Sequence, residues 1–156
     1  GMKVIVHTRT ESKVTEYNKD VHEDEKVKFV TLDELLSTSD IVSLHCPLTN
    51  ENKGLINSDA LKKIKDGALL INTARGPLVD EQAVRDALDS GKLRGYATDV
   101  LSSEPMSEDC PLLNAKNCVI TPHVAWAAKE TRERLLSIAV ENLRSFLNGK
   151  VINRVN

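Results

Sequence analysis

The sequence predicts an α/β protein with a doubly wound parallel sheet, and two patterns support this prediction. Short β-branched runs alternate with segments of helical periodicity, which is typical of βαβ units rather than of a sandwich or a helical bundle. Most of these runs are almost continuously apolar, as expected for strands that are covered on both faces. Six strands are therefore predicted, at residues 4–7, 27–30, 41–45, 68–73, 95–100 and 118–121.

Helices are predicted between the strands because capping residues stand where the helices should begin. Three helical segments are preceded by a side chain that can accept the first free amide protons, namely Thr31, Asn57 and Asp80. Gly91 ends the third of these segments. A longer C-terminal helix is predicted at 129–148, where apolar residues recur at helical spacing before Gly149 stops the helix.

The composition is that of an ordinary folded domain and argues against nucleic-acid binding. The chain has 156 residues, with 21 Lys and Arg against 23 Asp and Glu, so its net charge is −2. This length corresponds to one domain covering residues 1–156. There is no basic excess to neutralise a phosphate backbone, and aromatic residues make up only 3% of the chain, so a base-stacking surface is disfavoured.

The cysteines and the apolar runs indicate a cytoplasmic protein without a metal site or a membrane segment. Cys46, Cys110 and Cys118 are an odd number, and no CxxC or Cys/His ligand spacing links them. We interpret them as reduced thiols. The apolar runs fall far short of the roughly 18 residues that a membrane-spanning helix requires, and the N-terminus lacks a signal-type pattern.

Charged side chains follow three of the predicted strands. Arg75 comes after strand 68–73 beside a Gly-Pro turn, Glu104 follows strand 95–100, and His123 follows strand 118–121. Each residue alone has an ordinary explanation: a surface arginine at a turn, a solvated acid, or a histidine without a catalytic role. In an open parallel sheet, however, ligands bind beyond the carboxyl ends of the strands.

Together, these three side chains are expected to share one cleft. A guanidinium can bind a carboxylate through two hydrogen bonds, which makes Arg75 a candidate for holding an acid substrate. A carboxylate beside an imidazole favours the protonated ring, which makes His123 a candidate acid/base with Glu104 as its neighbour. The predicted ligand is a small oxo acid or hydroxy acid.

At this point the sequence resembles the NAD-binding domain of the D-isomer-specific 2-hydroxyacid dehydrogenases over nearly its whole length. The motifs that carry the resemblance are LHCPLT at 44–49, LLINTARGPLVD at 69–80, TDV at 98–100 with Glu104-Pro105, and Thr121-Pro122-His123. The resemblance implies a Rossmann-like sheet, NAD or NADP as cofactor, and a small 2-oxo or 2-hydroxy acid as substrate.

The resemblance also implies residue roles. Arg75 would bind the substrate carboxylate and polarise its carbonyl, His123 would donate or accept the proton, and Glu104 would tune His123. Asp99 would accept a hydrogen bond from the nicotinamide carboxamide. The residues that would line the cofactor are Cys46, Pro47, Thr73, Ala74 and Ala125.

Within the family, the residues around His123 resemble the glycerate dehydrogenase or hydroxypyruvate reductase branch. The segment 124–127 reads VAWA, and Trp126 would either cover the small substrate or pack in the core. Formate oxidation is disfavoured because Thr121 stands where formate dehydrogenases have Gln.

The end of the second strand of this fold bears on the choice of cofactor. An acid there usually binds the adenosine ribose in NAD enzymes, but this chain reads Thr8-Arg9-Thr10. We therefore expect NADP to be accepted and even preferred, with Arg9 pairing with its phosphate. Alternatively, Arg9 stacks on adenine and leaves NAD usable.

The resemblance is incomplete at the N-terminus. The first strand, the GxGxxG turn and a preceding substrate domain are absent from this sequence, so we expect a partial dinucleotide-binding domain, a fragment that is inactive alone. The missing central strand should leave two open edges, at 4–6 and 42–44. We expect order only within a longer polypeptide, or closure of the gap by intermolecular pairing, strand swapping or displacement of the N-terminal segment.

Three functions follow from these observations. The first is a dehydrogenase that forms a homodimer through the cofactor domain. The second is a nucleotide-sensing, corepressor-like interaction module, because some relatives keep the same Arg, Glu and His in that role. The third is a folded but inactive dimerisation unit.

Overall fold

The computed structural model describes residues 1–155. The chain divides into two compact units, of which the first is Gly1–Thr121 and the second begins at Pro122. The C-terminal helix therefore lies in a unit of its own.

All six predicted strands are present in the first unit, and they pair in parallel. Their bounds are β1 (Ile5–Val6), β2 (Lys28–Phe29), β3 (Ile41–Leu44), β4 (Ala68–Asn72), β5 (Leu93–Thr98) and β6 (Cys118–Ile120). Strands β3-β4-β5-β6 form one four-stranded sheet in that order, and β1 and β2 form a separate two-stranded sheet. Among residues 1–155, no strand pairing joins these two sheets.

The first unit has four helices and two short 3₁₀ helices. The helices are α1 (Glu11–Tyr17), α2 (Leu32–Thr38), α3 (Ser58–Lys63) and α4 (Glu81–Asp89), and the 3₁₀ helices span Glu23–Glu25 and Gly76–Leu78. All three predicted caps are confirmed: the side chains of Thr31, Asn57 and Asp80 accept amide protons from the first turns of α2, α3 and α4. The sequence did not predict α1, in which Val14 is the buried residue.

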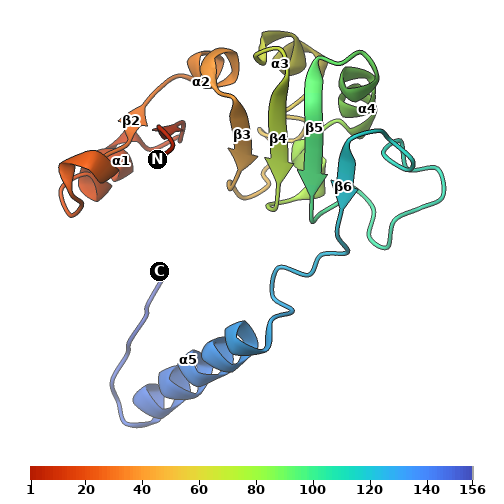
Figure 1. Ribbon diagram of the computed structural model, residues 1–156. Coiled ribbons are helices and arrows are strands. Elements are labelled where there is room, and N and C mark those ends of the chain that lie inside the picture. Colours follow the sequence, from red (N-terminus) through yellow and green to blue (C-terminus); the bar gives the residue numbers. More distant parts are fainter. Residues whose placement is uncertain (156) are drawn as a thin grey trace. The chain divides into compact units, whose positions relative to one another are not determined.

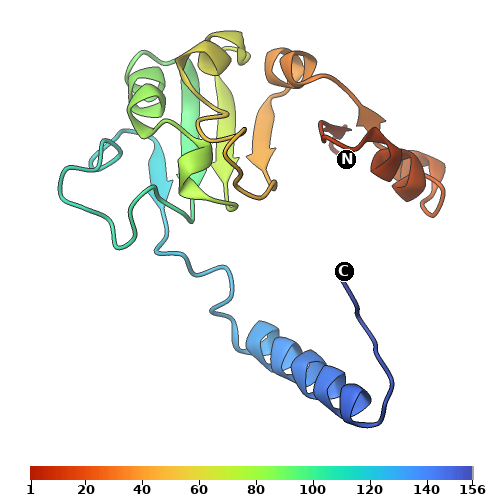
Figure 2. The same cartoon turned by 180° about the vertical axis from the view of Figure 1, so that it is seen from behind.

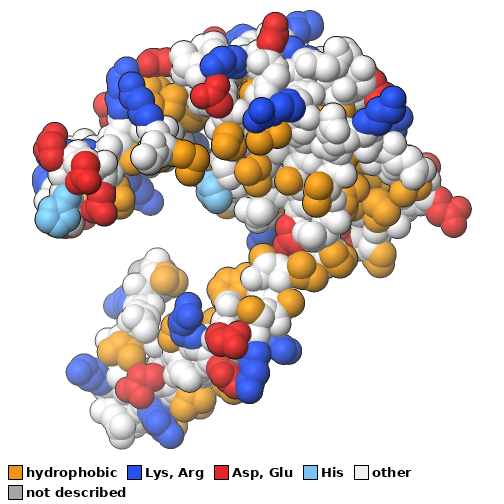
Figure 3. All heavy atoms as spheres, viewed as in Figure 1, with side chains coloured by type: hydrophobic (Ala, Val, Ile, Leu, Met, Phe, Trp, Pro, Cys, Tyr) orange, Lys and Arg blue, Asp and Glu red, His pale blue; other side chains and the backbone are white. Residues whose placement is uncertain are grey.

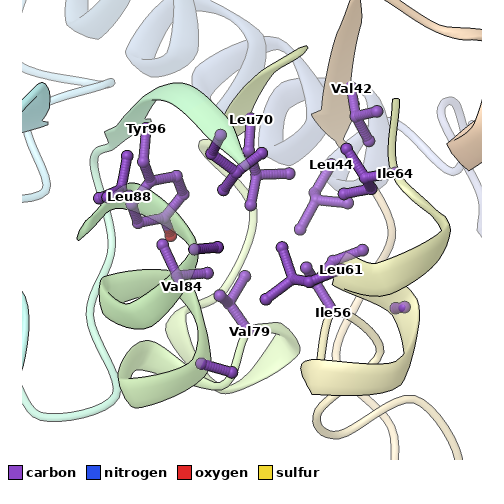
Figure 4. Close-up of a cluster of buried hydrophobic side chains, with 14 of the residues drawn as sticks. Val42, Leu44, Ile56, Leu61, Ile64, Leu70, Val79, Val84, Leu88 and Tyr96 are labelled. Carbon is purple, nitrogen blue, oxygen red and sulfur yellow. The ribbon is translucent and has the colours of Figure 1, made fainter. Parts of the chain in front are cut away.

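The core of this unit lies between one face of the four-stranded sheet and the helices α3 and α4 (Figures 1 and 2). Buried side chains from the strands meet those of both helices there, as the close-up shows for Leu44, Leu61, Leu70, Val84 and Leu88 (Figure 4). Burial of such aliphatic side chains is the main stabilising contribution.

Within the first unit, helices α3 and α4 pack on one face of the four-stranded sheet. Burial alternates along β3 and β4, which is the pattern of strands packed on one side. The opposite face leaves Ile41 and Val119 exposed. Continuous apolar sequence indicated the strands correctly but did not predict which face the described helices cover.

The topology fixes where functional side chains can gather. Because β3, β4, β5 and β6 are parallel neighbours, the segments that follow them emerge at the same edge of the sheet. That edge carries the turns after Leu44, Asn72 and Thr98.

The second unit contains α5 (Lys129–Leu147), close to the predicted 129–148. Gly149 follows with φ +74°, as expected of a glycine that ends a helix. Leu136, Leu143 and Phe146 are exposed, and Figure 3 shows hydrophobic side chains on the visible surface of this helix between charged ones. Within residues 1–155, no helix is long and apolar enough to cross a membrane.

Candidate functional site

The turn after β4 carries Arg75, and hydrogen bonds from the buried Asn72 side chain hold this turn in place. Asn72 is 0% exposed. Its Nδ2 donates to the Arg75 carbonyl oxygen at 2.9 Å, and its Oδ1 accepts from the Ala74 amide at 3.1 Å. One side chain thus satisfies two backbone groups, which fixes the path of the chain on both sides of Arg75's amide.

The Arg75 side chain itself is exposed. Its Nη1 donates to the Ala74 carbonyl oxygen at 2.6 Å, which leaves its other guanidinium donors available to an anion. Thr73 is exposed and Ala74 half-buried on the same turn.

Gly76 brings the turn after β4 against the loop after β5. A Cβ at Gly76 would lie 2.0 Å from the Leu101 carbonyl carbon and 2.4 Å from the Ser102 nitrogen. Only a residue without a side chain allows this approach of two backbones. The loops that carry Arg75 and Glu104 are therefore in direct contact.

Glu104 lies in this second loop. Its Oε1 accepts from the Leu101 amide at 2.8 Å, so the carboxylate folds back onto the start of its own loop. The side chain remains exposed.

Asp99 is buried at the carboxyl end of β5. Its amide donates to the Asn72 carbonyl oxygen at 3.0 Å, which joins the ends of β4 and β5. The Thr121 hydroxyl donates to Asp99 Oδ1. Thr121, which the sequence singled out only as a replacement for Gln, thus helps to orient the Asp99 carboxylate.

The turn after β3 carries Cys46 and Pro47, and Asn52 organises it. Asn52 Oδ1 accepts from the Thr49 amide at 2.7 Å, and Nδ2 donates to the Pro47 carbonyl oxygen at 2.8 Å. The Asn52 amide also approaches Cys46 Sγ at 3.8 Å. Sequence reasoning missed both Asn52 and Asn72, although an Asn within or just after a turn-forming segment is a common sign of such bonding.

The second unit holds His123 and Ala125. His123 is exposed and has φ +53°, a conformation uncommon outside glycine. The Ala127 amide donates to the Val124 carbonyl oxygen at 2.8 Å, which forms a turn directly before α5. Trp126 is 59% exposed within these residues.

Thr8, Arg9 and Thr10 follow β1 in the two-stranded sheet. Thr8 is half-buried, whereas Arg9 and Thr10 are exposed. The Thr10 amide lies 3.4 Å from Thr8 Oγ1, a weak contact that shapes the turn before α1.

Residues 1–125 match the family described as D-isomer specific 2-hydroxyacid dehydrogenase, NAD binding domain. The chain belongs to this family. The Rossmann-like fold predicted from the resemblance is thereby confirmed, in partial form, because the parallel strands match those of solved 2-hydroxyacid dehydrogenase-like structures.

Two relatives of this 2-hydroxyacid dehydrogenase domain illustrate the sequence identities and the activities found among similar proteins. The chain is 49% identical to a hydroxypyruvate reductase from Blautia hydrogenotrophica over 100% of its own length and 46% of the relative's. It is 40% identical to a glyoxylate reductase from Aeropyrum pernix over 97% of its length and 43% of the relative's. The chain thus spans less than half the length of these relatives.

Among the solved structures similar to this domain, one contains NADPH and another contains NAD. An acyclic imino acid reductase in complex with NADPH and D-Arg aligns with a TM-score of 0.80 at 32% identity, over 99% of this chain and 46% of that one. A D-lactate dehydrogenase from Aquifex aeolicus, complexed with NAD and lactic acid, aligns with a TM-score of 0.75 at 34% identity, over 96% and 47%.

The residues of the dehydrogenase domain fit one end of such a cofactor. Asp99 places a buried, oriented carboxylate at the strand edge, where it can accept from a carboxamide. Thr73 and Ala74 offer a small, accessible turn beside it. A glycine-rich pyrophosphate turn is not among these 156 residues, so no residue here is assigned to the pyrophosphate.

Proposed function

We propose that this chain is part of an enzyme that reduces a small 2-oxo acid, such as hydroxypyruvate or glyoxylate, to the corresponding 2-hydroxy acid. The contact of Gly76 with Leu101 carries the proposal, because it joins the loop of an anion-binding arginine to the loop of a carboxylate that can tune an acid. The names of the relatives at 49% and 40% identity support this substrate class.

Arg75 binds the substrate. Its exposed guanidinium pairs with the substrate carboxylate and polarises the 2-oxo group. Because Asn72 holds the peptide groups of Ala74 and Arg75, the guanidinium starts from a fixed backbone.

His123 supplies the proton. When bound, the nicotinamide cofactor would supply a hydride for the reduction. His123 donates the proton that the substrate carbonyl oxygen takes up as the alcohol forms. In this proposal Glu104 tunes His123 as the acid/base. Asp99 orients the cofactor amide, while Cys46, Pro47, Thr73, Ala74 and Ala125 line the cofactor.

NADP is accepted in this proposal, because Thr8-Arg9-Thr10 contains no carboxylate that would repel its 2′-phosphate. Residues 1–156 act as a partial dinucleotide-binding domain that forms a homodimer. All three cysteines are free thiols, which fits a cytoplasmic protein.

Steady-state kinetics of the full natural polypeptide on hydroxypyruvate, glyoxylate and pyruvate test the proposal. Arg75→Ala and His123→Ala should each lower kcat/KM by about a hundredfold or more, and Glu104→Gln should lower it less and move the pH profile. Arg94→Ala and His22→Ala are matched controls, since both side chains are exposed and Arg94 lies near the amino end of β5. If His123→Ala kept more than roughly half of the wild-type rate, the assignment would be wrong.

A further inference from the structure

The loop that carries Glu104 is hydrogen-bonded to side chains on one face of α4. This segment, residues 101–113, contains no strand or helix of its own. Glu81 and Arg85 stand one helical turn apart on α4 and reach it at two places. Arg85 Nη1 donates to the carbonyl oxygens of Pro111 at 3.1 Å and Leu113 at 3.3 Å, near the end of the segment.

Glu81 holds the beginning of the same segment. Its Oε1 accepts from the Ser102 amide at 2.7 Å, and the Cys110 thiol lies 3.9 Å from its Oε2. A carboxylate that accepts from a backbone amide makes a stronger hydrogen bond than a neutral acceptor does. Glu81 is half-buried at the first position of α4, where the helix dipole favours a negative charge.

The bond from Ser102 to Glu81 lies between two contacts that concern the proposed active site. Directly before it, the Leu101 peptide rests on Gly76, and the Leu101 amide donates to Glu104. Two residues after it stands Glu104 itself. A shift of the Ser102 peptide therefore moves Glu104 relative to the turn that carries Arg75.

We propose that Glu81 is a positioning residue for the reduction, acting through the Ser102 peptide to hold Glu104 where it can tune the proton donor. This inference rests on the proposed function. Since Glu81 supports the carboxylate rather than the substrate-binding arginine, its loss affects the proton-transfer step, and so kcat, more than KM.

A different role for Glu81 is to stabilise the start of α4 by its charge alone, and two conservative variants separate the two roles. Glu81→Gln keeps an oxygen that reaches Ser102 but removes the charge. Glu81→Asp keeps the charge near the helix start but is one methylene too short to reach. Gln82→Ala is the matched control, because its exposed side chain lies on the same turn and bonds to Asp86 rather than to the loop.

The experiment measures kcat and KM of the full natural polypeptide together with amide hydrogen exchange at Ser102. We expect Glu81→Asp to lower kcat about tenfold or more, to change KM less than about threefold and to speed Ser102 exchange. Glu81→Gln should stay within about threefold of wild type in kcat and keep Ser102 protected.

The proposal requires kcat to follow Ser102 protection across these variants. A fall in kcat without loss of protection, a loss of protection without a fall in kcat, or no change in either would overturn the role of Glu81. A wild-type protein without turnover on any 2-oxo acid would instead overturn the proposed function, while exchange would still report whether Glu81 holds the loop.

Discussion

Replacing Gly76 with Ala tests whether the contact between the two loops of the proposed active site is obligatory. The added Cβ would lie 2.0 Å from the Leu101 carbonyl carbon, whereas ordinary contact begins near 3.4 Å. The Leu101 peptide must therefore move by the difference, about 1.4 Å. The obstructing atoms belong to the backbone, so no side-chain rotation can relieve the clash.

Two effects should follow from Gly76→Ala. Overpacking of this kind costs about 1–3 kcal/mol, and we expect the upper end of that range for the free energy of unfolding because backbone must shift. A misplacement of about 1 Å at catalytic groups can reduce the rate about a hundredfold, so kcat of the full polypeptide should fall by a similar factor.

Urea denaturation and steady-state kinetics of the full natural polypeptide measure the two effects. Gly91→Ala is the control, since Gly91 has φ +76° and no atom within 4 Å of its added Cβ. It should cost about 1 kcal/mol through backbone strain and leave kcat unchanged. A Gly76→Ala protein with an unfolding free energy within about 0.5 kcal/mol of wild type would refute the steric argument.

Three further predictions concern the core, the pH dependence and the cofactor. Leu70→Ala should lower the free energy of unfolding by about 2–5 kcal/mol because Leu70 is 0% exposed, whereas Leu48→Ala, at an exposed site, should cost less than about 0.5 kcal/mol in the same urea titration. Burial raises the pKa of Tyr96 from 10.0 to about 12, so its phenol ionises more readily in the unfolded chain. The contribution of the neutral phenol to the free energy of unfolding is therefore complete below pH 10 and is lost as the pH rises to about 12. Tyr96→Phe should accordingly show a shallower fall in stability across that window, and a slope equal to that of wild type would contradict the assignment. Arg9→Asp should shift the ratio of kcat/KM from NADPH toward NADH by about tenfold or more; a wild-type preference for NADH above about tenfold would count against the expected role of Arg9.

The sequence predicted the fold well because its signals are local. The caps Thr31, Asn57 and Asp80 act within the first turn of their own helices, so their side chains identify the helix starts directly. By contrast, α1 buries little beyond Val14 and therefore has no clear apolar periodicity to detect. Strand β5 begins at Leu93, two residues before the predicted start, because pairing with β4 extends past the apolar run.

Within the candidate site, the sequence predicted only those residues whose side-chain type itself indicates a chemical role. Arg75, Glu104 and His123 are charged or titratable groups placed after strands, and that pattern can be recognised in the sequence alone. The residues that hold the two loops in place cannot be recognised in this way. Asn72 resembles any polar residue at a strand end, and Glu81 resembles any acid at a helix start, until the fold brings Arg75's peptide to one and Ser102 to the other.

The supports of the two loops suggest how such a site can be redesigned. The arginine turn is held from the sheet by Asn72, and the carboxylate loop is held from a helix by Glu81, so each can be varied while the other keeps its bonds. If the proposed roles hold, selection for a bulkier acid can therefore act around Arg75 without changing the environment of the proposed proton donor. Gly76, where the two loops touch, is the position that a mutagenesis library should leave untouched.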